Sequence, residues 1–439
     1  MTASPQPIDD QTPPFHKAAD VSASAKQQDK QNQASGQSSP IEDPNRRTKI
    51  LFFYQDFGAA GGIERFIAQL AKDLFDAKSY DPIVVCTHDS PLYHRLKEHR
   101  INVHGIESSG WLSNPHLRFL DLATWRQVKQ ILDREKPDLV HVHIGHLEHL
   151  FFKRWGYPVV YSFHGYGSLY SMANVMNPVK RWIKQLTRKC FRWMAGKLDA
   201  LVFVSHAEQR RMISEEYLDP DMQAEVVHNG IDLTLIEEKV GKTDIITMRR
   251  TLGLPVKAPL VSFINRLDAN KNPWHFLELV DRLCAIPELE AVHFVIAGNG
   301  PLEDEVRVRT RLKPYRDRIH VVGYQKDIYP LIATSSLIVH IPDREGFGLG
   351  VLEAMALGVP CIATKVGGIP EIVDIPEQSE LLVYPGDIDG MVQRAVQWLN
   401  PENTQRDELI QSLKTRAQEF DLSRQTASIL EVYHRVLNI

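Results

Sequence analysis

A glycine-rich turn between two carboxylates is the part of this chain whose residue types most plainly suggest chemistry. It reads Glu345-Gly-Phe-Gly-Leu-Gly-Val-Leu-Glu353, between an apolar run at residues 337–341 that predicts a buried strand and a run from Leu352 that predicts a helix. Glycine lets the backbone approach a ligand closely, and the N-terminus of a helix binds anions. Two glutamates would repel a phosphate bound alone, so we interpret them as acceptors for hydroxyl groups on either side of it. The turn therefore predicts a nucleotide-sugar site.

Two cations follow another predicted strand of the same half of the chain. Arg266 and Lys271 come directly after an apolar run at residues 260–265. Cations at a strand end, close to a helix N-terminus, would neutralise a diphosphate and the charge that develops as it departs. The alternative is a solvated loop with no ligand.

The first half of the chain contributes glycines and one histidine to the candidate site. Gly61 and Gly62 lie between a predicted strand at residues 49–54 and an amphipathic helix that reaches Phe75. They suit a phosphate at a helix entry, but the spacing is not the dinucleotide fingerprint, and glycine at such a turn is often purely conformational. His164 ends another predicted strand and precedes glycine, which suits a ligand site; a hydrogen-bonded structural histidine is the alternative.

Metal ligands are suggested at two kinds of place, and neither is well supported. His141 and His143 lie two residues apart on one face of a predicted strand, as zinc ligands can, but no cysteine or further ligand cluster accompanies them. The segments Asp219-Pro-Asp221 and Asp387-Ile-Asp389 match the D-x-D pattern of metal-dependent glycosyl transfer, which recurs by chance. We therefore expect no metal and no bound cofactor.

The elements that position these residues follow from two series of apolar runs. Both series alternate with helical patterns, which predicts parallel sheets covered by helices. The runs lie at residues 49–54, 82–86, 138–143, 159–164, 200–205 and 226–228, and then at 260–265, 293–298, 320–324, 337–341, 361–364 and 381–384. In open α/β sheets ligands bind beyond the carboxyl ends of the strands, where most of the residues above fall.

The same pattern predicts the domain organisation. Residues 1–47 are polar and predict a disordered tail. Two α/β domains follow at residues 48–240 and 241–417, and the second contains the predicted nucleotide-sugar turn. Residues 418–439 predict a helix whose apolar face suits either domain, and we expect it to cross back to the first.

Composition limits the class of protein. A hydrophobic content of 43%, a charged content of 24% and a net charge of −4 are typical of a soluble globular protein and argue against nucleic-acid binding. The four scattered cysteines indicate a reducing compartment. We find no apolar run of about 18–20 residues and no signal peptide, so we expect a cytoplasmic protein.

One basic helix suggests contact with a membrane. Residues 178–197 hold seven Lys or Arg and no acid, together with Trp182 and Trp193. Such a helix suits an anionic membrane surface, and peripheral attachment to the inner face of the cell membrane follows from that interpretation. The alternative is a helix whose apolar side packs in the core.

Taken together and in order, these motifs resemble the family 4 retaining glycosyltransferases, which have the GT-B fold of two Rossmann-like domains facing a deep inter-domain cleft. The resemblance runs from about residue 49 to residue 437. The motifs that carry it are Gly61-Gly-Ile-Glu-Arg65, Ser162-Phe-His-Gly165, Val202-Phe-Val-Ser-His-Ala207, His228-Asn-Gly-Ile-Asp232, Arg266-Leu with Lys271, Ala297-Gly-Asn-Gly-Pro301, the run from Glu345 to Glu353, and Gly367-Gly-Ile-Pro-Glu371. Asn265, His228 and Ile341-Pro342 depart from the family pattern, which affects local loop shape rather than charge.

The resemblance implies a role for each candidate residue. Those on the second domain bind the donor: Glu345 the sugar, Glu353 the ribose, the backbone of Phe347, Gly348 and Leu349 the sugar and phosphates, Arg266 and Lys271 the diphosphate, with Tyr324 near the base. Those on the first domain close on it: Gly61 and Gly62 at the phosphates, and His164 at the sugar and reacting centre.

We therefore expect a retaining, metal-independent enzyme that moves a hexose-type sugar from a nucleoside diphosphate to a hydroxyl group. The acceptor would be a lipid-linked saccharide or a surface polysaccharide precursor, chosen by loops at residues 111–117 and 166–177. Two alternatives share the donor site: a GT-B sugar-nucleotide epimerase, and a non-catalytic scaffold that binds sugar nucleotides.

Overall fold

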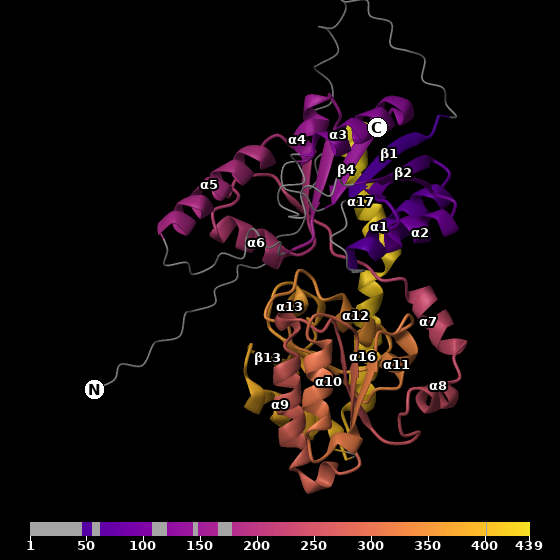
Figure 1. The fold of residues 1–439 in the computed structure, drawn as a ribbon, viewed down its shortest axis with the longest axis vertical. Coiled ribbons are helices and arrows are strands. Elements are labelled where there is room, and N and C mark those ends of the chain that lie inside the picture. The colour runs from indigo at the N-terminus through magenta and orange to yellow at the C-terminus, as the bar shows by residue number, and fades with distance from the viewer. Residues whose placement is uncertain (1–45, 55–61, 108–120, 144–147, 166–177, 401) are drawn as a thin grey trace, which may run out of the picture. The chain divides into compact units, whose positions relative to one another are not determined.

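The chain forms two parallel β-sheets, each covered by helices (Figure 1). The computed structural model describes residues 46–54, 62–107, 121–143, 148–165, 178–400 and 402–439, the side chains at 148, 178–184, 187 and 377 excepted. The predicted tail, Gly61 and the two predicted acceptor loops lie outside these residues, apart from positions 46 and 47 of the tail.

The first sheet has seven parallel strands in the order β3-β2-β1-β4-β5-β6-β7. Its strands are β1 Thr48–Tyr54, β2 Tyr80–Thr87, β3 Asn102–Ile106, β4 Leu139–His143, β5 Val159–Phe163, β6 Ala200–Phe203 and β7 Glu225–Val226. Its helices are α1 Gly62–Asp76, α2 Pro91–Glu98, α3 Leu122–Glu135, α4 Glu148–Arg154, α5 Pro178–Ala195 and α6 His206–Ser214. Alternate residues of β1 enter opposite cores, Ile50 and Phe52 one and Leu51 and Phe53 the other, as expected when helices cover both faces.

The second sheet has six parallel strands in the order β10-β9-β8-β11-β12-β13. Its strands are β8 Leu260–Ile264, β9 His293–Ala297, β10 Ile319–Gly323, β11 Leu337–His340, β12 Cys361–Thr364 and β13 Leu382–Val383. The accompanying α-helices are α9 Pro273–Cys284, α10 Glu303–Arg311, α11 Tyr329–Ala333, α12 Leu349–Ala356, α13 Ile369–Ile372, α14 Pro376–Ser379, α15 Ile388–Leu399 and α16 Arg406–Ala417.

The two sheets confirm the predicted pair of α/β halves, with one strand missed. Each predicted apolar run overlaps a strand whose ends differ from the prediction by at most two residues. The missed strand is β3, which lies at the edge of the first sheet and buries only Ile106 fully. A partly exposed edge strand that contains Gly105 lacks the apolar run on which the prediction depended.

In the sequence between β7 and β8, the chain forms α7 Leu233–Gly241 and α8 Ile245–Thr251. Arg249 of α8 is buried and donates hydrogen bonds to the carbonyls of Pro255, Val256, Ala258 and Thr334. The polar stretch that interrupts the two series of runs is thereby attached to the second sheet.

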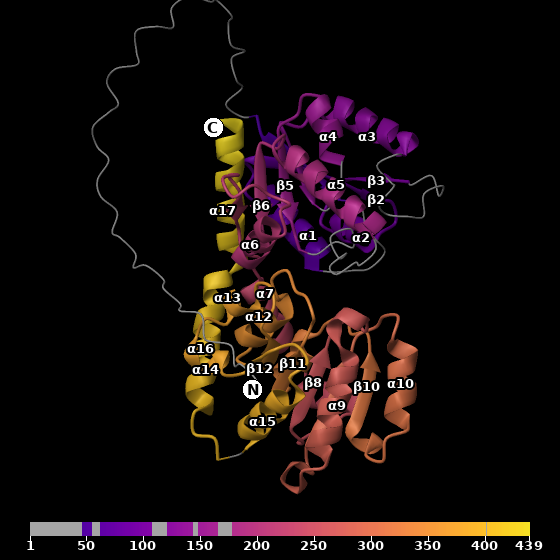
Figure 2. The ribbon, with the colours of Figure 1, turned by 90° about the vertical axis from the view of Figure 1, so that its left-hand side faces the viewer.

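The last helix, α17 Leu422–Leu437, returns to the first sheet and runs alongside its strands (Figure 2). Ile429, Val432 and Tyr433 are buried in the same core as Ile50 and Phe52. The returning backbone pairs with the outgoing chain, since Ile231 donates to the Phe420 carbonyl at 3.0 Å and accepts from Leu422 at 3.0 Å. Two adjacent segments therefore connect the halves of the chain.

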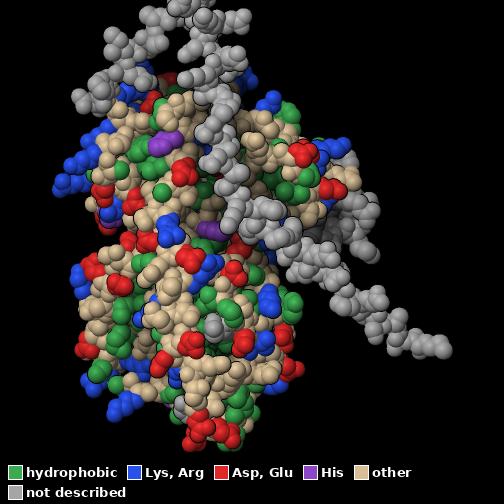
Figure 3. All heavy atoms as spheres, turned by 180° about the vertical axis from the view of Figure 1, so that it is seen from behind, with side chains coloured by type: hydrophobic (Ala, Val, Ile, Leu, Met, Phe, Trp, Pro, Cys, Tyr) green, Lys and Arg blue, Asp and Glu red, His purple; other side chains and the backbone are tan. Residues whose placement is uncertain are grey.

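The surface charges are mixed rather than segregated over much of the face in Figure 3, where Lys and Arg side chains alternate with Asp and Glu. Within the described residues, none of the helices combines the length and the hydrophobicity that spanning a membrane requires.

Candidate functional site

An ion pair between Lys271 and Glu345 lies where the strand order of the second sheet reverses. Lys271 follows β8 and Glu345 follows β11, and these two strands are neighbours although β9 and β10 intervene in the sequence. Lys271 Nζ lies 2.6 Å from Glu345 Oε2, and about a fifth of each side chain is exposed. The point where the order reverses is where open α/β sheets bind ligands.

The loops that carry this pair are held to one another by amide side chains. Asn270 Nδ2 donates to the Arg344 carbonyl at 3.0 Å, and Asn272 Nδ2 donates to the Ile341 carbonyl at 3.0 Å. The Asp343 amide donates to the Asn270 carbonyl at 2.8 Å. The spacing between Lys271 and Glu345 is therefore set by a network that depends on no ligand.

Glu345 has a second partner in His340, the last residue of β11, whose Nε2 lies 3.1 Å from the same carboxylate oxygen. Burial alone would raise the pKa of Glu345, but Lys271 and the His340 hydrogen bond hold it below its ordinary value. Glu345 is thus a carboxylate at neutral pH, able to accept hydroxyl hydrogens.

Glu353, the second carboxylate of the motif, is buried on α12 and contacts the first half of the chain. Its Oε1 accepts from Arg65 Nη1 of α1 at 3.0 Å, and Tyr329 also donates to the carboxylate. Burial raises the pKa of Glu353, while the charge of Arg65 and the Tyr329 hydrogen bond oppose that rise. Arg65 thus favours the ionised form, in which both oxygens accept hydrogen bonds.

The turn between the two glutamates exposes backbone rather than side chain. Phe347 is buried and stacks on His228, with ring centroids 5.4 Å apart. Gly348 is the N-cap of α12 and has φ 113°, a left-handed conformation that favours glycine. Leu349 approaches α1 closely, since a Cβ at Gly62 would lie 3.0 Å from its Cδ1. Gly62 therefore lies close to the turn that contains Phe347, Gly348 and Leu349.

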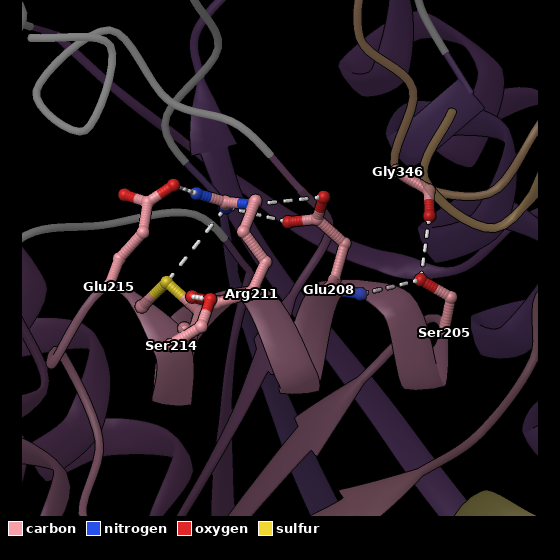
Figure 4. A network of polar contacts seen from close by, with 7 residues as sticks. Ser205, Glu208, Arg211, Ser214, Glu215 and Gly346 are labelled. Atoms are coloured by element: carbon pink, nitrogen blue, oxygen red, sulfur yellow. Dashed lines mark hydrogen bonds and ion pairs between the residues drawn. The ribbon is translucent and has the colours of Figure 1, made fainter. Parts of the chain in front are cut away.

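His164 lies against the same turn. A Cβ at Gly346 would be 2.5 Å from the His164 carbonyl oxygen, so only glycine permits this approach. Ser205, the N-cap of α6, accepts from the Glu208 amide at 3.2 Å and donates to the Gly346 carbonyl at 2.8 Å (Figure 4). Backbone contacts thus join the turn after β5, the start of α6 and the residue after Glu345.

Glu371, to which the sequence analysis assigned no role, strengthens the contacts at the start of α6. Glu371 accepts from the amides of His206 at 3.0 Å and Ala207 at 2.6 Å, the first residues of α6. His228 Nε2 lies 2.9 Å from the same carboxylate. Burial would raise the pKa of Glu371, but the hydrogen bonds from His228, His206 and Ala207 lower it. The motif Gly367-Gly-Ile-Pro-Glu371 marked this residue in the sequence. Nothing in the sequence indicated which groups the carboxylate contacts.

Arg266 and Tyr324 are less closely associated with the ion pair. Arg266 follows β8, is half exposed, and pairs with Asp268 at 3.3 Å. Tyr324 follows β10, two strands from β8 in the sheet order, and 60% of its surface is exposed. Both lie at the carboxyl edge of the sheet.

Most of the residues considered as metal ligands have other partners. His141 contacts Tyr433 and Ser162, and His143 contacts His164. Asp219 pairs with Arg192, Asp387 caps α15, and Asp389 pairs with Arg282. Over the described part of the chain, His, Cys, Asp and Glu side chains form no group of three suited to a metal ion.

Family comparisons match both halves of the chain. Residues 60–235 match the family model described as Glycosyltransferase Family 4, and residues 244–419 match that described as Glycosyl transferases group 1.

Curated relatives cover most of the chain at low identity. One is the UDP-Gal:alpha-D-GlcNAc-diphosphoundecaprenol alpha-1,3-galactosyltransferase of Escherichia coli, 25% identical over 76% of this chain and 84% of the relative. Another is the N-acetyl-alpha-D-glucosaminyl L-malate synthase of Bacillus anthracis, 26% identical over 72% of this chain and 80% of the relative.

Solved structures share the fold. HepE of Anabaena, solved in complex with UDP and glucose, superposes with a TM-score of 0.67 at 23% identity and covers 88% of this chain and 99% of its own. A glycosyltransferase from Rickettsia africae gives a TM-score of 0.71 at 18% identity, over 89% of this chain and 99% of its own. With two parallel-sheet domains, both family matches and these neighbours, the chain belongs to glycosyltransferase family 4 and is a glycosyltransferase of the GT-B fold.

Proposed function

We propose that this glycosyltransferase moves a hexose-type sugar, with retention of configuration, from a nucleoside diphosphate to a hydroxyl group of a saccharide or lipid-linked saccharide. The observation that carries the proposal is the Lys271–Glu345 ion pair at the switch point of the second sheet. A carboxylate and an ammonium group side by side suit a ligand that presents sugar hydroxyls next to a diphosphate.

The donor would lie along the carboxyl edge of the second sheet. Glu345 accepts hydroxyls of the sugar, the turn from Phe347 to Leu349 offers backbone amides, and Glu353 accepts the ribose hydroxyls. Arg266 is half exposed and paired only loosely with Asp268, so its guanidinium is available to turn towards the diphosphate. Lys271, already bonded to Glu345, adds a second positive charge.

The chemistry follows from this placement of charge. As the bond between the anomeric carbon and the diphosphate breaks, negative charge grows on the leaving oxygen, and Arg266 and Lys271 stabilise it. The acceptor hydroxyl attacks from the face that the diphosphate leaves, and the departing phosphate takes its proton. No protein base is needed in this scheme.

UDP-hexoses and lipid-linked acceptors are the first substrates to test. The Escherichia coli relative is named for UDP-Gal and a diphosphoundecaprenol acceptor, and HepE was solved with UDP and glucose. Release of nucleoside diphosphate that requires the acceptor distinguishes transfer from epimerisation and from simple binding.

Replacing either member of the ion pair should impair turnover. Glu345→Ala and Lys271→Ala are each expected to lower kcat by about tenfold or more, because each removes a preorganised charge from the reacting centre. The assay is acceptor-dependent release of nucleoside diphosphate, with folding checked by circular dichroism. Lys326→Ala, a cation elsewhere at the same edge, is the matched control, and wild-type rates in both site variants would refute the assignment.

Catalysis is proposed to need no metal ion, because Asp219, Asp387 and Asp389 of the D-x-D segments have structural partners and two cations are available to the leaving group. EDTA in excess over contaminating metal should leave the transfer rate within about twofold of the untreated enzyme. A large loss that Mg²⁺ or Mn²⁺ restores would show that the diphosphate requires a metal.

Peripheral attachment to an anionic membrane is proposed for α5. The helix buries Phe191, Met194 and Ala195, whereas Leu186 and Trp193 are 53% and 58% exposed. Lys189 and Lys197 are also exposed, and Lys197 Nζ lies 5.8 Å from the centre of the Trp193 ring. An exposed stripe of aromatic, aliphatic and basic residues suits the interface of an anionic bilayer.

The double variant Lys189→Glu with Trp193→Ala should bind anionic vesicles about tenfold more weakly or worse, since it removes an apolar anchor and reverses a charge. Sedimentation with phosphatidylglycerol vesicles measures this. Lys365→Glu with Tyr384→Ala is the matched control, because Lys365 lies over the exposed Tyr384 in the same way. Equal binding by both double variants would leave α5 with a packing role only.

A further inference from the structure

Three histidine side chains lie next to one another, close to the turn after Glu345 that forms part of the proposed donor site. His141 and His143 belong to β4, and His164 directly follows the neighbouring strand β5. The rings of His141 and His143 are 3.9 Å apart between centroids, and His143 Nδ1 lies 2.9 Å from His164 Nε2. Neither the proposed donor contacts nor the reaction scheme uses His141 or His143.

His141 is explained by structure alone. Its Nδ1 lies 2.6 Å from the Tyr433 hydroxyl of α17, and its Nε2 lies 2.7 Å from Ser162 Oγ of β5. Both ring nitrogens are therefore bonded, and the side chain joins two strands to the returning helix.

His143 is not explained in that way. It is completely buried between the rings of Phe52 and Phe66, and its Nε2 has no hydrogen-bond partner within the described residues. Burying an unsatisfied polar atom costs about 1–3 kcal/mol. An apolar side chain would fill the same space without that cost. What a histidine provides here, and an apolar residue does not, is the hydrogen bond to His164.

Both members of the pair are neutral. Burial lowers the pKa of His143 well below its ordinary value, with the nearby His141 and His164 adding to the effect, and burial lowers the pKa of His164 to about 3. In a bond between two neutral imidazoles one ring donates and the other accepts, so the bond fixes the tautomer of each.

The unbonded nitrogens indicate which ring donates. If His164 donated from Nε2, His143 would carry its proton on Nε2, and a buried N–H would be left without a partner. If His143 donates from Nδ1, its Nε2 carries only a lone pair. An unsatisfied buried acceptor is more common in proteins than an unsatisfied N–H. His164 Nδ1 is also unbonded, so either arrangement leaves one N–H without a partner in the described structure. The two rings differ in their surroundings, because His143 has no exposed surface, whereas His164 is partly exposed and lies against the turn of the proposed donor site. A bound sugar can give the His164 N–H a partner and cannot reach His143, which favours donation by His143 and leaves the proton of His164 on Nδ1.

The Nδ1 atom of His164 is buried and also lacks a partner in the described structure. His164 lies directly against Gly346, the residue after Glu345. An oxygen of the bound sugar would satisfy this N–H.

We propose that His143 is a positioning residue for glycosyl transfer: by donating from Nδ1 to His164 Nε2, it fixes His164 in the Nδ1-protonated tautomer that donates to an oxygen of the donor sugar. The proposal rests on the proposed function, because the oxygen of the bound sugar is what distinguishes the two tautomers.

The tautomer is tested first, on the full chain labelled with ¹⁵N at histidine and saturated with a UDP-hexose. The ring resonances of His164, assigned by their loss in His164→Gln, should report a protonated Nδ1 and an unprotonated Nε2. In His143→Leu this pattern should change, because the donor is gone. A wild-type His164 protonated on Nε2 would overturn the proposal, whatever reaction the protein catalyses.

The role in transfer is tested by kinetics. His143→Leu should lower kcat/KM for the sugar nucleotide by about tenfold, the value of one lost hydrogen bond, while Kd for the nucleoside diphosphate alone stays within about twofold. His143→Asn, which retains a donor near the position of Nδ1, should recover most of the loss. Ser162→Ala, which removes a partner of His141 and leaves the His143–His164 bond intact, is the control and should transfer normally.

A parallel loss of nucleoside diphosphate binding in His143→Leu, or no recovery in His143→Asn, would assign His143 to packing and overturn the positioning role. If the wild-type protein transferred no sugar, the proposed function would fail, and the spectra would still decide the tautomer.

Discussion

The ion pair between Lys271 and Glu345 depends on one topological constraint, and the rest of the site is arranged around it. The second sheet reverses its strand order between β8 and β11, so the loops that follow these strands lie side by side although 74 residues separate the paired side chains. A partly buried carboxylate in that place would be costly without a cation, and its lowered pKa reflects the compensation. The pair thus keeps both charges at a strand edge that water reaches only in part.

Close backbone contacts then bring the first half of the chain to this pair. Gly346 accepts a hydrogen bond from Ser205 and lies against the His164 carbonyl. Glu371 accepts hydrogen bonds from the first two backbone amides of α6. Arg65 reaches Glu353 from α1. These contacts use glycine, a helix N-terminus and paired charges, so the residues proposed to meet the donor on both sides are positioned by the protein before any ligand is present. Preorganised groups of this kind are those that stabilise developing charge most effectively.

Much of the fold and part of the site could be predicted from the sequence, for identifiable reasons. Strands that are buried on both faces appear in the sequence as apolar runs. β3 was missed because it is a partly exposed edge strand and has no such run. Glu345, Lys271 and the glycines were found because their types are unusual at strand ends. The pairing of Arg65 with Glu353, 288 residues apart, and of Glu371 with α6 could not be found, because local patterns do not specify which distant segments meet. His143 appeared only as half of a possible zinc pair, since its contact with His164 depends on the register of β4 and β5.

The central claim is that the switch point of the second sheet binds a nucleoside diphosphate. Its most direct test is the thermal unfolding midpoint of the wild-type protein and of Arg266→Ala in the presence of UDP, GDP or ADP. Arg266 is half exposed, so its loss should not disturb the fold. We expect one nucleotide to raise the wild-type midpoint, by an amount equivalent to about 2.7 kcal/mol of stability at a hundredfold excess over Kd, and to raise that of Arg266→Ala clearly less. No shift with any of the three, or the same shift in both proteins, would contradict the claim.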